Sequence, residues 1–301
     1  MGEWGEAGAL ALYEARGNVA QAQATLAVRH REPPSSASTG GGSGRAGGPR
    51  PSVPPEAAGL PTEVAEAKFK QWEAEFPGER LPMDVADLTR HRQALREAVP
   101  AAATAQPLWA DYVAYLETRA AEIKQGIAEK GPLKWAGYRL VRDRYARGLS
   151  FERKMVSLLE ADAALPRAQR RWLKDFDQPR IETHVGVAKV DIRFADVLVI
   201  EDGPVAGPTP RVETFSFKSR DFKLADRDAL AAQMTTDAGH ALRYYGETLN
   251  ILRSEIRQQA HIQRIRLVYE GGPLFPKDPK MVRAAIATAK RRVEGVEVLV
   301  E

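Results

Sequence analysis

An aspartate, a serine and a lysine on two expected strands are the residues of this sequence best suited to chemistry. Asp196 lies in the apolar run of residues 190–200, and Ser216 and Lys218 lie in the run of residues 212–220. A buried carboxylate or ammonium is costly unless it has a partner or a function. Side chains alternate faces along a strand, so Ser216 and Lys218 point to the same side. If the two strands pair, Asp196 and Lys218 meet near one end of a sheet.

A carboxylate and an ammonium at one place can serve a divalent cation and its substrate. Mg²⁺ or Mn²⁺ takes oxygen ligands and keeps several waters, so one or two carboxylates, a carbonyl and a substrate phosphate suffice. Such a metal would activate water and neutralise charge on the phosphate, while Lys218 orients the nucleophile or supports the developing negative charge. The sequence has no cysteine, so a metal must bind carboxylates, histidines or carbonyls.

A purely structural explanation of the same residues stays open. Asp196 could cap a strand edge, and Lys218 could form an ion pair with Asp191 or Glu213. The histidines of this half of the chain lack metal-ligand spacing and are expected to be structural: His184, His240 and His261. The sequence has no phosphate-binding loop of the Walker type and no Gly-x-Ser-x-Gly elbow, which disfavours nucleotide hydrolysis and serine hydrolase chemistry.

The composition describes a globular chain with a slight excess of positive charge. Its 301 residues are 44% hydrophobic, with a net charge of +4, which fits a polyanionic partner without requiring one. Two basic sets could hold a phosphate backbone or form ordinary solvated faces: Arg167, Arg170, Arg171 and Lys174, and residues 290–292. No apolar run approaches the roughly 20 residues of a membrane span, and the N-terminus lacks a secretory pattern. We therefore expect a cytoplasmic protein that, if delivered elsewhere, leaves without a cleavable signal peptide.

Composition and periodicity divide the chain into four parts. Residues 1–31 have helical spacing, and residues 32–60 are rich in Gly, Ser and Pro, as in a flexible linker. Residues 61–149 are expected to be helical, and residues 150–301 to form an α/β domain. The expected helices of the third part cover residues 61–76, 84–99, 108–128 and 134–147. In the helix of residues 108–128, the stripe of Trp109, Tyr112, Tyr115 and Leu116 is assigned to packing.

The last part alternates helices and strands. A helix is expected to begin at Ser150, which can serve as its N-cap, and to carry Glu152. Strands at 180–187, 190–200 and 212–218 follow, then a helix at 225–257, a strand at 262–269, a helix at 279–292 and a strand at 296–300. The order α-β-β-β-α-β-α-β predicts an α/β fold with a mixed central sheet flanked by helices.

The segments Phe-Ala-Asp196-Val-Leu-Val-Ile and Phe-Ser216-Phe-Lys218-Ser-Arg resemble the core of the PD-(D/E)xK nuclease superfamily, which has the restriction-endonuclease-like fold. That family's α-β-β-β-α-β core matches the expected order from residue 150 onward. The resemblance implies that Asp196 is the first acid of the motif, with an alanine where proline often stands, and that Lys218 is its lysine. Glu152 resembles a glutamate on the helix before the sheet, and Gln233 a glutamine on the helix after it.

One position departs from the family pattern. Ser216 stands where the family usually has a glutamate or aspartate, and its hydroxyl is a weaker, neutral metal ligand. Asp191 and Glu213 lie at odd spacings, on the wrong face of a regular strand unless a bulge re-aims them. Glu152 could supply the second acid without a bulge. The candidate metal ligands are therefore Asp196, Glu152, Asp191 and Glu213.

The resemblance implies a metal-dependent nuclease that hydrolyses phosphodiester bonds, with DNA as the expected substrate. A compact nuclease behind a linker and a helical front is also similar to bacterial polymorphic toxins and secreted effectors, which implies an immunity protein and a delivery or adaptor partner. Ser216 keeps a second hypothesis open, in which a catalytically degenerate domain binds nucleic acid or a protein without cleavage. A third is a helical interaction protein with an α/β scaffold.

Overall fold

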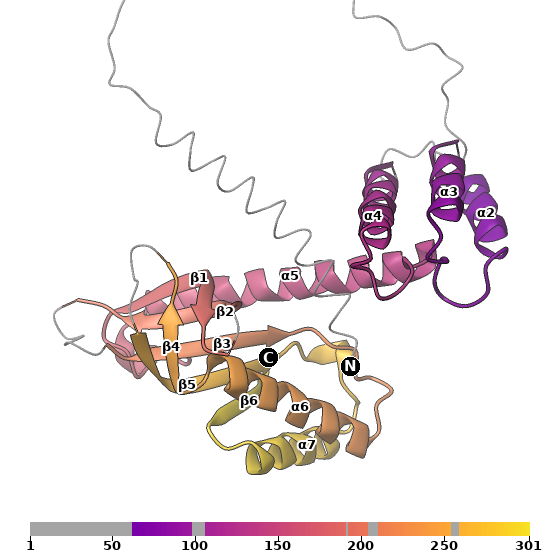
Figure 1. Ribbon diagram of the computed structural model, residues 1–301. Coiled ribbons are helices and arrows are strands. Elements are labelled where there is room, and N and C mark those ends of the chain that lie inside the picture. The colour runs from indigo at the N-terminus through magenta and orange to yellow at the C-terminus, as the bar shows by residue number, and fades with distance from the viewer. Residues whose placement is uncertain (1–61, 98–105, 191, 204–209, 254–258) are drawn as a thin grey trace, which may run out of the picture. The chain divides into compact units, whose positions relative to one another are not determined.

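A computed structural model describes residues 62–97, 106–190, 192–203, 210–253 and 259–301 (Figure 1). The expected N-terminal helical segment and the linker, residues 1–60, lie outside these ranges. The chain divides into two units, Met1–Asp143 and Arg144–Glu301. In the part of the chain that the structure describes, no helix is both long and apolar enough to cross a membrane.

Among its described residues, the first unit contains three helices and the beginning of a fourth. These are α2 (Thr62–Glu73), α3 (Val85–Glu97), α4 (Gln106–Lys124) and α5 (Trp135–Ala163), whose first residues belong to this unit. The aromatic stripe of α4 packs in the core, as expected: Trp109, Tyr112 and Leu116 are buried with Trp135 and Tyr138. Burial of this face stabilises helices of ordinary propensity.

Helix α5 corrects one expectation from the sequence. Two helices, separated at Gly148, were expected on the strength of Ser150 as an N-cap, but residues 135–163 form one continuous helix. Gly148 has open space around it and Ser150 is exposed. A glycine within a helix costs about 1 kcal/mol. Burial of Phe151, Met155 and Leu159 on one face of the helix contributes more than this cost.

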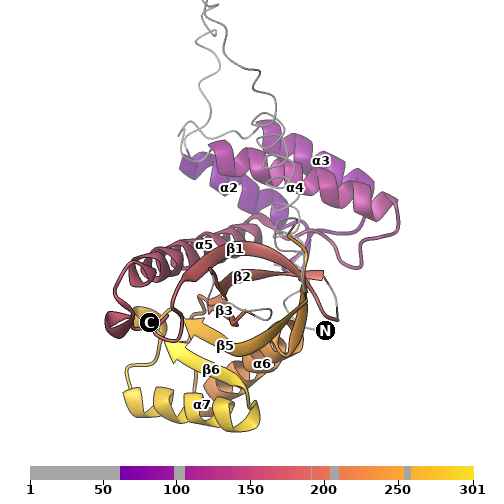
Figure 2. The same ribbon diagram turned by 90° about the vertical axis from the view of Figure 1, so that its left-hand side faces the viewer.

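The second unit is a mixed α/β structure with a six-stranded sheet flanked by helices (Figure 2). Its strands are β1 (Pro179–Ala188), β2 (Ile192–Glu201), β3 (Val212–Lys218), β4 (Thr248–Ile251), β5 (Gln259–Tyr269) and β6 (Val296–Val300). Its helices after α5 are α6 (Arg227–Tyr245) and α7 (Pro279–Arg292), with short 3₁₀ turns at Arg167–Gln169 and Gly272–Leu274. The expected class is confirmed at this level.

The pairing of the strands closes most of the sheet on itself. β1 pairs with β2 and β4, β2 with β3, and β4 with β5, all antiparallel. β3 pairs with β5 in parallel, which completes a circuit of five strands, and β6 is added in parallel to the outside of β5. A sheet curled in this way buries both faces of β3, six of whose seven residues are buried.

Strand β4 was missed in the sequence. A helix was expected over residues 225–257, but α6 ends at Tyr245 and is followed by Gly246 and a strand. The backbone of Glu247 is left-handed, with φ of 59°, which ends the helical course of the chain. Leu249 and Ile251 then alternate with exposed residues and are buried in the core, a period-two signal that the helix assignment overlooked.

Two hydrophobic cores lie on the two faces of the sheet. One packs α5 on the face that carries Phe215 and Phe217. The other packs α6 and α7 on the face that carries Val212, Leu198 and Leu267. The candidate site lies where β1, β2 and the end of β3 meet.

Candidate functional site

Asp196 lies at the point where β2 and β3 separate. The two strands pair from Ile200 and Val212 to Val197 and Phe215, and their ladder ends there. One residue further, the Asp196 carboxylate accepts a hydrogen bond from the backbone N–H of Phe217 at 2.7 Å. The side chain thus replaces the next rung of the ladder and is held at a fixed place between the strands.

Lys218 and Ser216 face the same side of β3, as their spacing predicted. The Lys218 Nζ donates a hydrogen bond to the Ser216 Oγ at 3.0 Å. Ser216 is buried and Lys218 is the last residue of the strand. The serine hydroxyl therefore orients an ammonium group at the end of β3, a role that needs no charge on the serine.

Glu152 reaches the same place from α5. Its side chain is 16% exposed. Burial, and then the neighbouring Asp196 carboxylate, raise its pKa to about 7 against the opposing effect of the Lys218 ammonium. These electrostatic effects place Glu152, Asp196 and Lys218 near one another, although they come from three elements of the fold.

A chain of polar contacts holds α5 beside the end of β3. The Arg147 guanidinium on α5 donates from Nε to the Ser219 Oγ at 2.8 Å. Ser219 in turn donates its hydroxyl to Glu270, directly after β5. Glu152 lies five residues after Arg147, on the same helix, so this anchor also sets the position of its carboxylate.

His184 belongs to the site, although it was expected to be a structural histidine. Its Nε2 lies 3.1 Å from the Glu152 Oε1, and the backbone of His184 is left-handed, with φ of 49°. Such a conformation costs a residue other than glycine of order 1 kcal/mol. The ladder of β1 and β2 skips this residue between Thr183 and Val185. A lone histidine within a strand carries no signal that predicts this position.

Tyr245 closes the site on the side of α6. Its hydroxyl donates to the Phe194 carbonyl at 3.0 Å, two residues before Asp196. Burial raises the pKa of the Tyr245 hydroxyl, and so does the Asp196 carboxylate.

Gln233 lies in a separate polar network on α6. Its side chain donates to the Asp237 Oδ1 at 3.0 Å. Asp237 is buried and also accepts two hydrogen bonds from Arg220 and one from the Tyr269 hydroxyl, each of 2.8 Å. The hydrogen bond of Gln233 therefore lies within α6, and it supports Asp237, which joins α6 to Arg220 and to Tyr269 of β5.

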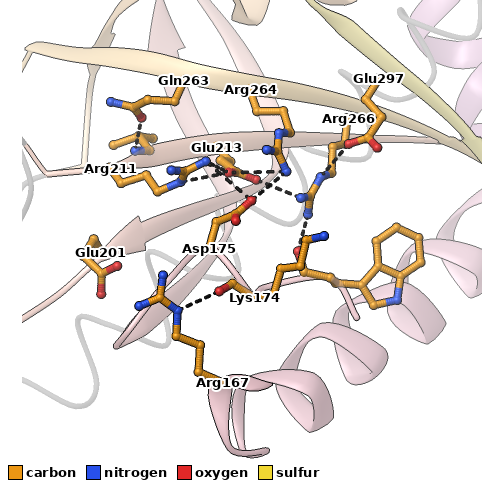
Figure 3. Close-up of polar contacts among 12 residues, drawn as sticks. Arg167, Lys174, Asp175, Glu201, Arg211, Glu213, Gln263, Arg264, Arg266 and Glu297 are labelled. Carbon is orange, nitrogen blue, oxygen red and sulfur yellow. Dashed lines mark hydrogen bonds and ion pairs between the residues drawn. The ribbon is translucent and has the colours of Figure 1, made fainter. Parts of the chain in front are cut away.

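Glu213 lies on the opposite face of β3 from Ser216. Its fully buried carboxylate accepts two hydrogen bonds from Arg211, at 3.0 and 2.7 Å, and lies 3.3 Å from the Arg266 guanidinium (Figure 3). Arg266 also lies over the ring of Phe215, which packs toward α5. The register of β3 against β2 is regular here, and the irregularity in its pairing with β5 skips Gln263 of β5. The odd spacing therefore keeps Glu213 away from Lys218. The other candidate of this kind, Asp191, lies outside the described residues.

Two carboxylates are therefore the donors that the fold brings together for a metal ion. Within the described ranges, no group of three or more His, Asp or Glu side chains is arranged to hold a metal. Glu152 and Asp196 repel one another, as the pKa of Glu152 records. This donor set fits Mg²⁺ or Mn²⁺, which needs one or two carboxylates and keeps bound water, and it does not fit a cation enclosed by protein ligands.

Comparisons with protein-family models, with curated proteins and with solved structures found no match to this chain, so no relative supports or contradicts an assignment of the site.

Proposed function

We propose that residues 144–301 form a metal-dependent nuclease of the PD-(D/E)xK type, which hydrolyses phosphodiester bonds in DNA. The observation that carries this proposal is the meeting of Glu152, Asp196 and Lys218 at one end of the sheet. Besides its contact with His184, Glu152 lies beside a second acid, and its pKa is raised to about 7. Perturbed groups of this kind concentrate at catalytic sites.

Each residue of the site has a distinct part in the proposed reaction. Glu152 and Asp196 would hold Mg²⁺ or Mn²⁺, which when bound supplies an activated water and neutralises phosphate charge. Lys218, oriented by Ser216, places its ammonium where negative charge develops on the phosphate. One oxygen of Asp196 accepts the hydrogen bond from the backbone of Phe217, which fixes the plane of the carboxylate and therefore the direction of its second oxygen.

DNA is the proposed substrate because its phosphates complement the chain's net charge of +4. By analogy of organisation alone, we also propose that the nuclease is the toxic domain of a bacterial antagonism effector, with an immunity protein as one partner and a delivery or adaptor protein as another.

Plasmid cleavage in the presence of MgCl₂ or MnCl₂ tests the proposal. Asp196→Asn keeps an oxygen for the Phe217 N–H but removes the charge, and Lys218→Met keeps the length of the side chain. Each should reduce cleavage by about a hundredfold or more. The exposed pair Asp228→Asn and Lys277→Met gives matched controls that should cleave like the wild type. Wild-type cleavage by both site variants would sink the assignment.

A non-cleaving nucleic-acid-binding domain is the second candidate, and Ser216 is the observation that favours it. DNA binding that weakens steeply with salt, without cleavage under any divalent cation, would select this function. Ser216→Asp separates the two cases further, because it restores the family's second acid. A degenerate site should gain cleavage from this change, whereas a site that already uses Glu152 as its second acid should not.

A further inference from the structure

One edge of strand β6 pairs with no strand in the part of the chain that the structure describes. Among the described strands it alone pairs with a single neighbour, β5. The backbone of Glu301 donates to the Tyr269 carbonyl at 2.9 Å and accepts from the Gly271 N–H at 2.8 Å. Backbone groups point to alternate sides along a strand, so every second residue of β6 turns its N–H and C=O away from β5. These residues are Val296, Val298 and Val300.

A groove of about 750 Å³ runs beside this edge. Its walls come from β5, β6, the end of α7 and the segment after α5 that includes Trp172. Five cations line it: Arg171, Lys174, Arg264, Arg266 and Lys290. Only two acids share the lining, Asp175 and Glu297, and the groove is therefore positively charged.

Polar contacts hold the inner part of the groove, and its charges are paired. Asp175 lies 3.0 Å from Arg264, and Glu297 accepts from Arg266 at 3.0 Å (Figure 3). The buried carboxylate of Asp162 accepts hydrogen bonds from the backbone N–H groups of residues 171–173. The groove is thus formed before any ligand binds, which lowers the entropic cost of binding.

The outer part of the groove carries positive charge that the fold does not use. Lys174 and Lys290 are exposed, and neither has an acidic partner among the residues that the structure describes. They come from two separate segments, the one after α5 and the end of α7, and both line the groove.

We propose that the β6 edge and its groove bind an extended, acidic segment of a partner protein, which adds to the sheet as a further strand. An added strand donates to and accepts from the outward groups of β6, while its acidic side chains meet the lysines of the groove. A nucleic acid backbone would satisfy the charge but offers no amide donors to the outward carbonyl groups of Val296 and Val298. The proposal does not depend on the nuclease function, because it uses none of the residues of that site.

Fluorescence anisotropy with a labelled short peptide, in which glutamate alternates with valine or threonine, tests the charge requirement. Lys174→Glu with Lys290→Glu should weaken binding of this peptide by about tenfold or more. Lys277→Glu with Lys280→Glu makes the same change of charge on exposed lysines outside the groove and should bind like the wild type. Equal binding by the two double variants would overturn the proposal.

A second pair of variants tests the backbone requirement. Val300→Pro removes one outward N–H and leaves the bonds of β6 to β5 in place, since proline is tolerated on the free side of an edge strand. It should weaken peptide binding by about tenfold, whereas Val300→Ala should not. Equal binding by both would contradict strand addition. The protein could instead bind a labelled oligonucleotide but no peptide, and lose that binding when Lys174 and Lys290 are changed. This result would show that the partner is a nucleic acid and not a protein.

Discussion

The two ends of strand β3 hold buried carboxylates in opposite states. At its beginning Glu213 is fully buried, and it is surrounded by the guanidinium groups of Arg211 and Arg266. At its end, beside Lys218, Glu152 and Asp196 lie close enough for one to raise the pKa of the other. One strand thus carries a compensated acid on the face toward α5, and near its end two acids lie close together, one of them beside Lys218 and His184.

The electrostatic surroundings of these carboxylates distinguish a structural acid from candidate functional acids. The attraction of two arginines offsets the desolvation of a buried carboxylate, so this carboxylate needs no ligand from outside the protein. Two neighbouring carboxylates disfavour each other's charged form until a proton or a cation joins them. The second arrangement persists only where the surrounding fold enforces it, and here the separation of β2 and β3, the anchor at Arg147 and the bend at His184 do so.

The largest expected change in stability follows from removing the charge of Glu213. Glu213→Gln leaves Arg266, 5% exposed, without its buried counter-charge, and should lower the free energy of unfolding by about 3 kcal/mol. Urea unfolding at pH 7, followed by tryptophan fluorescence, measures this loss. Glu297→Gln removes the more exposed partner of the same arginine and should cost less than about 1 kcal/mol. Similar losses in the two variants would show that Glu213 is not the residue that compensates Arg266.

A smaller effect of opposite sign is expected at the other end. The pKa of Glu152 rises from 4.5 to about 7 on folding, so the folded protein binds its proton more tightly between these values. Stability therefore falls as pH rises from about 4.5 to 7, and the loss is complete above pH 7. A shift of this size corresponds to about 3 kcal/mol, which solvent access to the side chain reduces to about 1–2 kcal/mol.

Glu152→Gln removes this penalty. In metal-free buffer it should exceed the wild type in free energy of unfolding by about 1–2 kcal/mol at pH 8 and match it near pH 4. Glu160→Gln, on the exposed side of the same helix, should match the wild type at both pH values. A constant difference between Glu152→Gln and the wild type at all pH values would contradict the raised pKa.

The smallest expected effect is the change in stability when the cation itself is added. At ten times its dissociation constant, Mg²⁺ should stabilise the wild type at pH 8 by about 1 kcal/mol. Thermal unfolding at matched ionic strength measures the increment. The combination of Glu152→Gln with Asp196→Asn should abolish it, and Glu213→Gln should retain it, because Glu213 lies on the other face. An increment that survives in the first variant would place the cation elsewhere.

Local patterns predicted the elements whose signals lie entirely within them. The expected bounds of β3, α7 and β6 agree with the structure, since each has clear ends: Lys218 closes a run of buried residues, Asp278 caps α7, and Gly295 precedes β6. The alternation along β3 also placed Ser216 and Lys218 together and Glu213 apart. By contrast, the continuity of α5 across Gly148 and the strand β4 depend on packing partners that are distant in sequence.

By itself the sequence determined which residue types stand on which strand, and so the candidate acid, serine and lysine of the site. Only the tertiary structure decided which groups join them. The left-handed backbone at His184, the place where β2 leaves β3, and the anchoring of α5 together bring Glu152 and His184 to Asp196. These features arise from the curl of the sheet and from burial. Both depend on contacts between segments far apart in the chain, so neither produces a periodic pattern within a single segment.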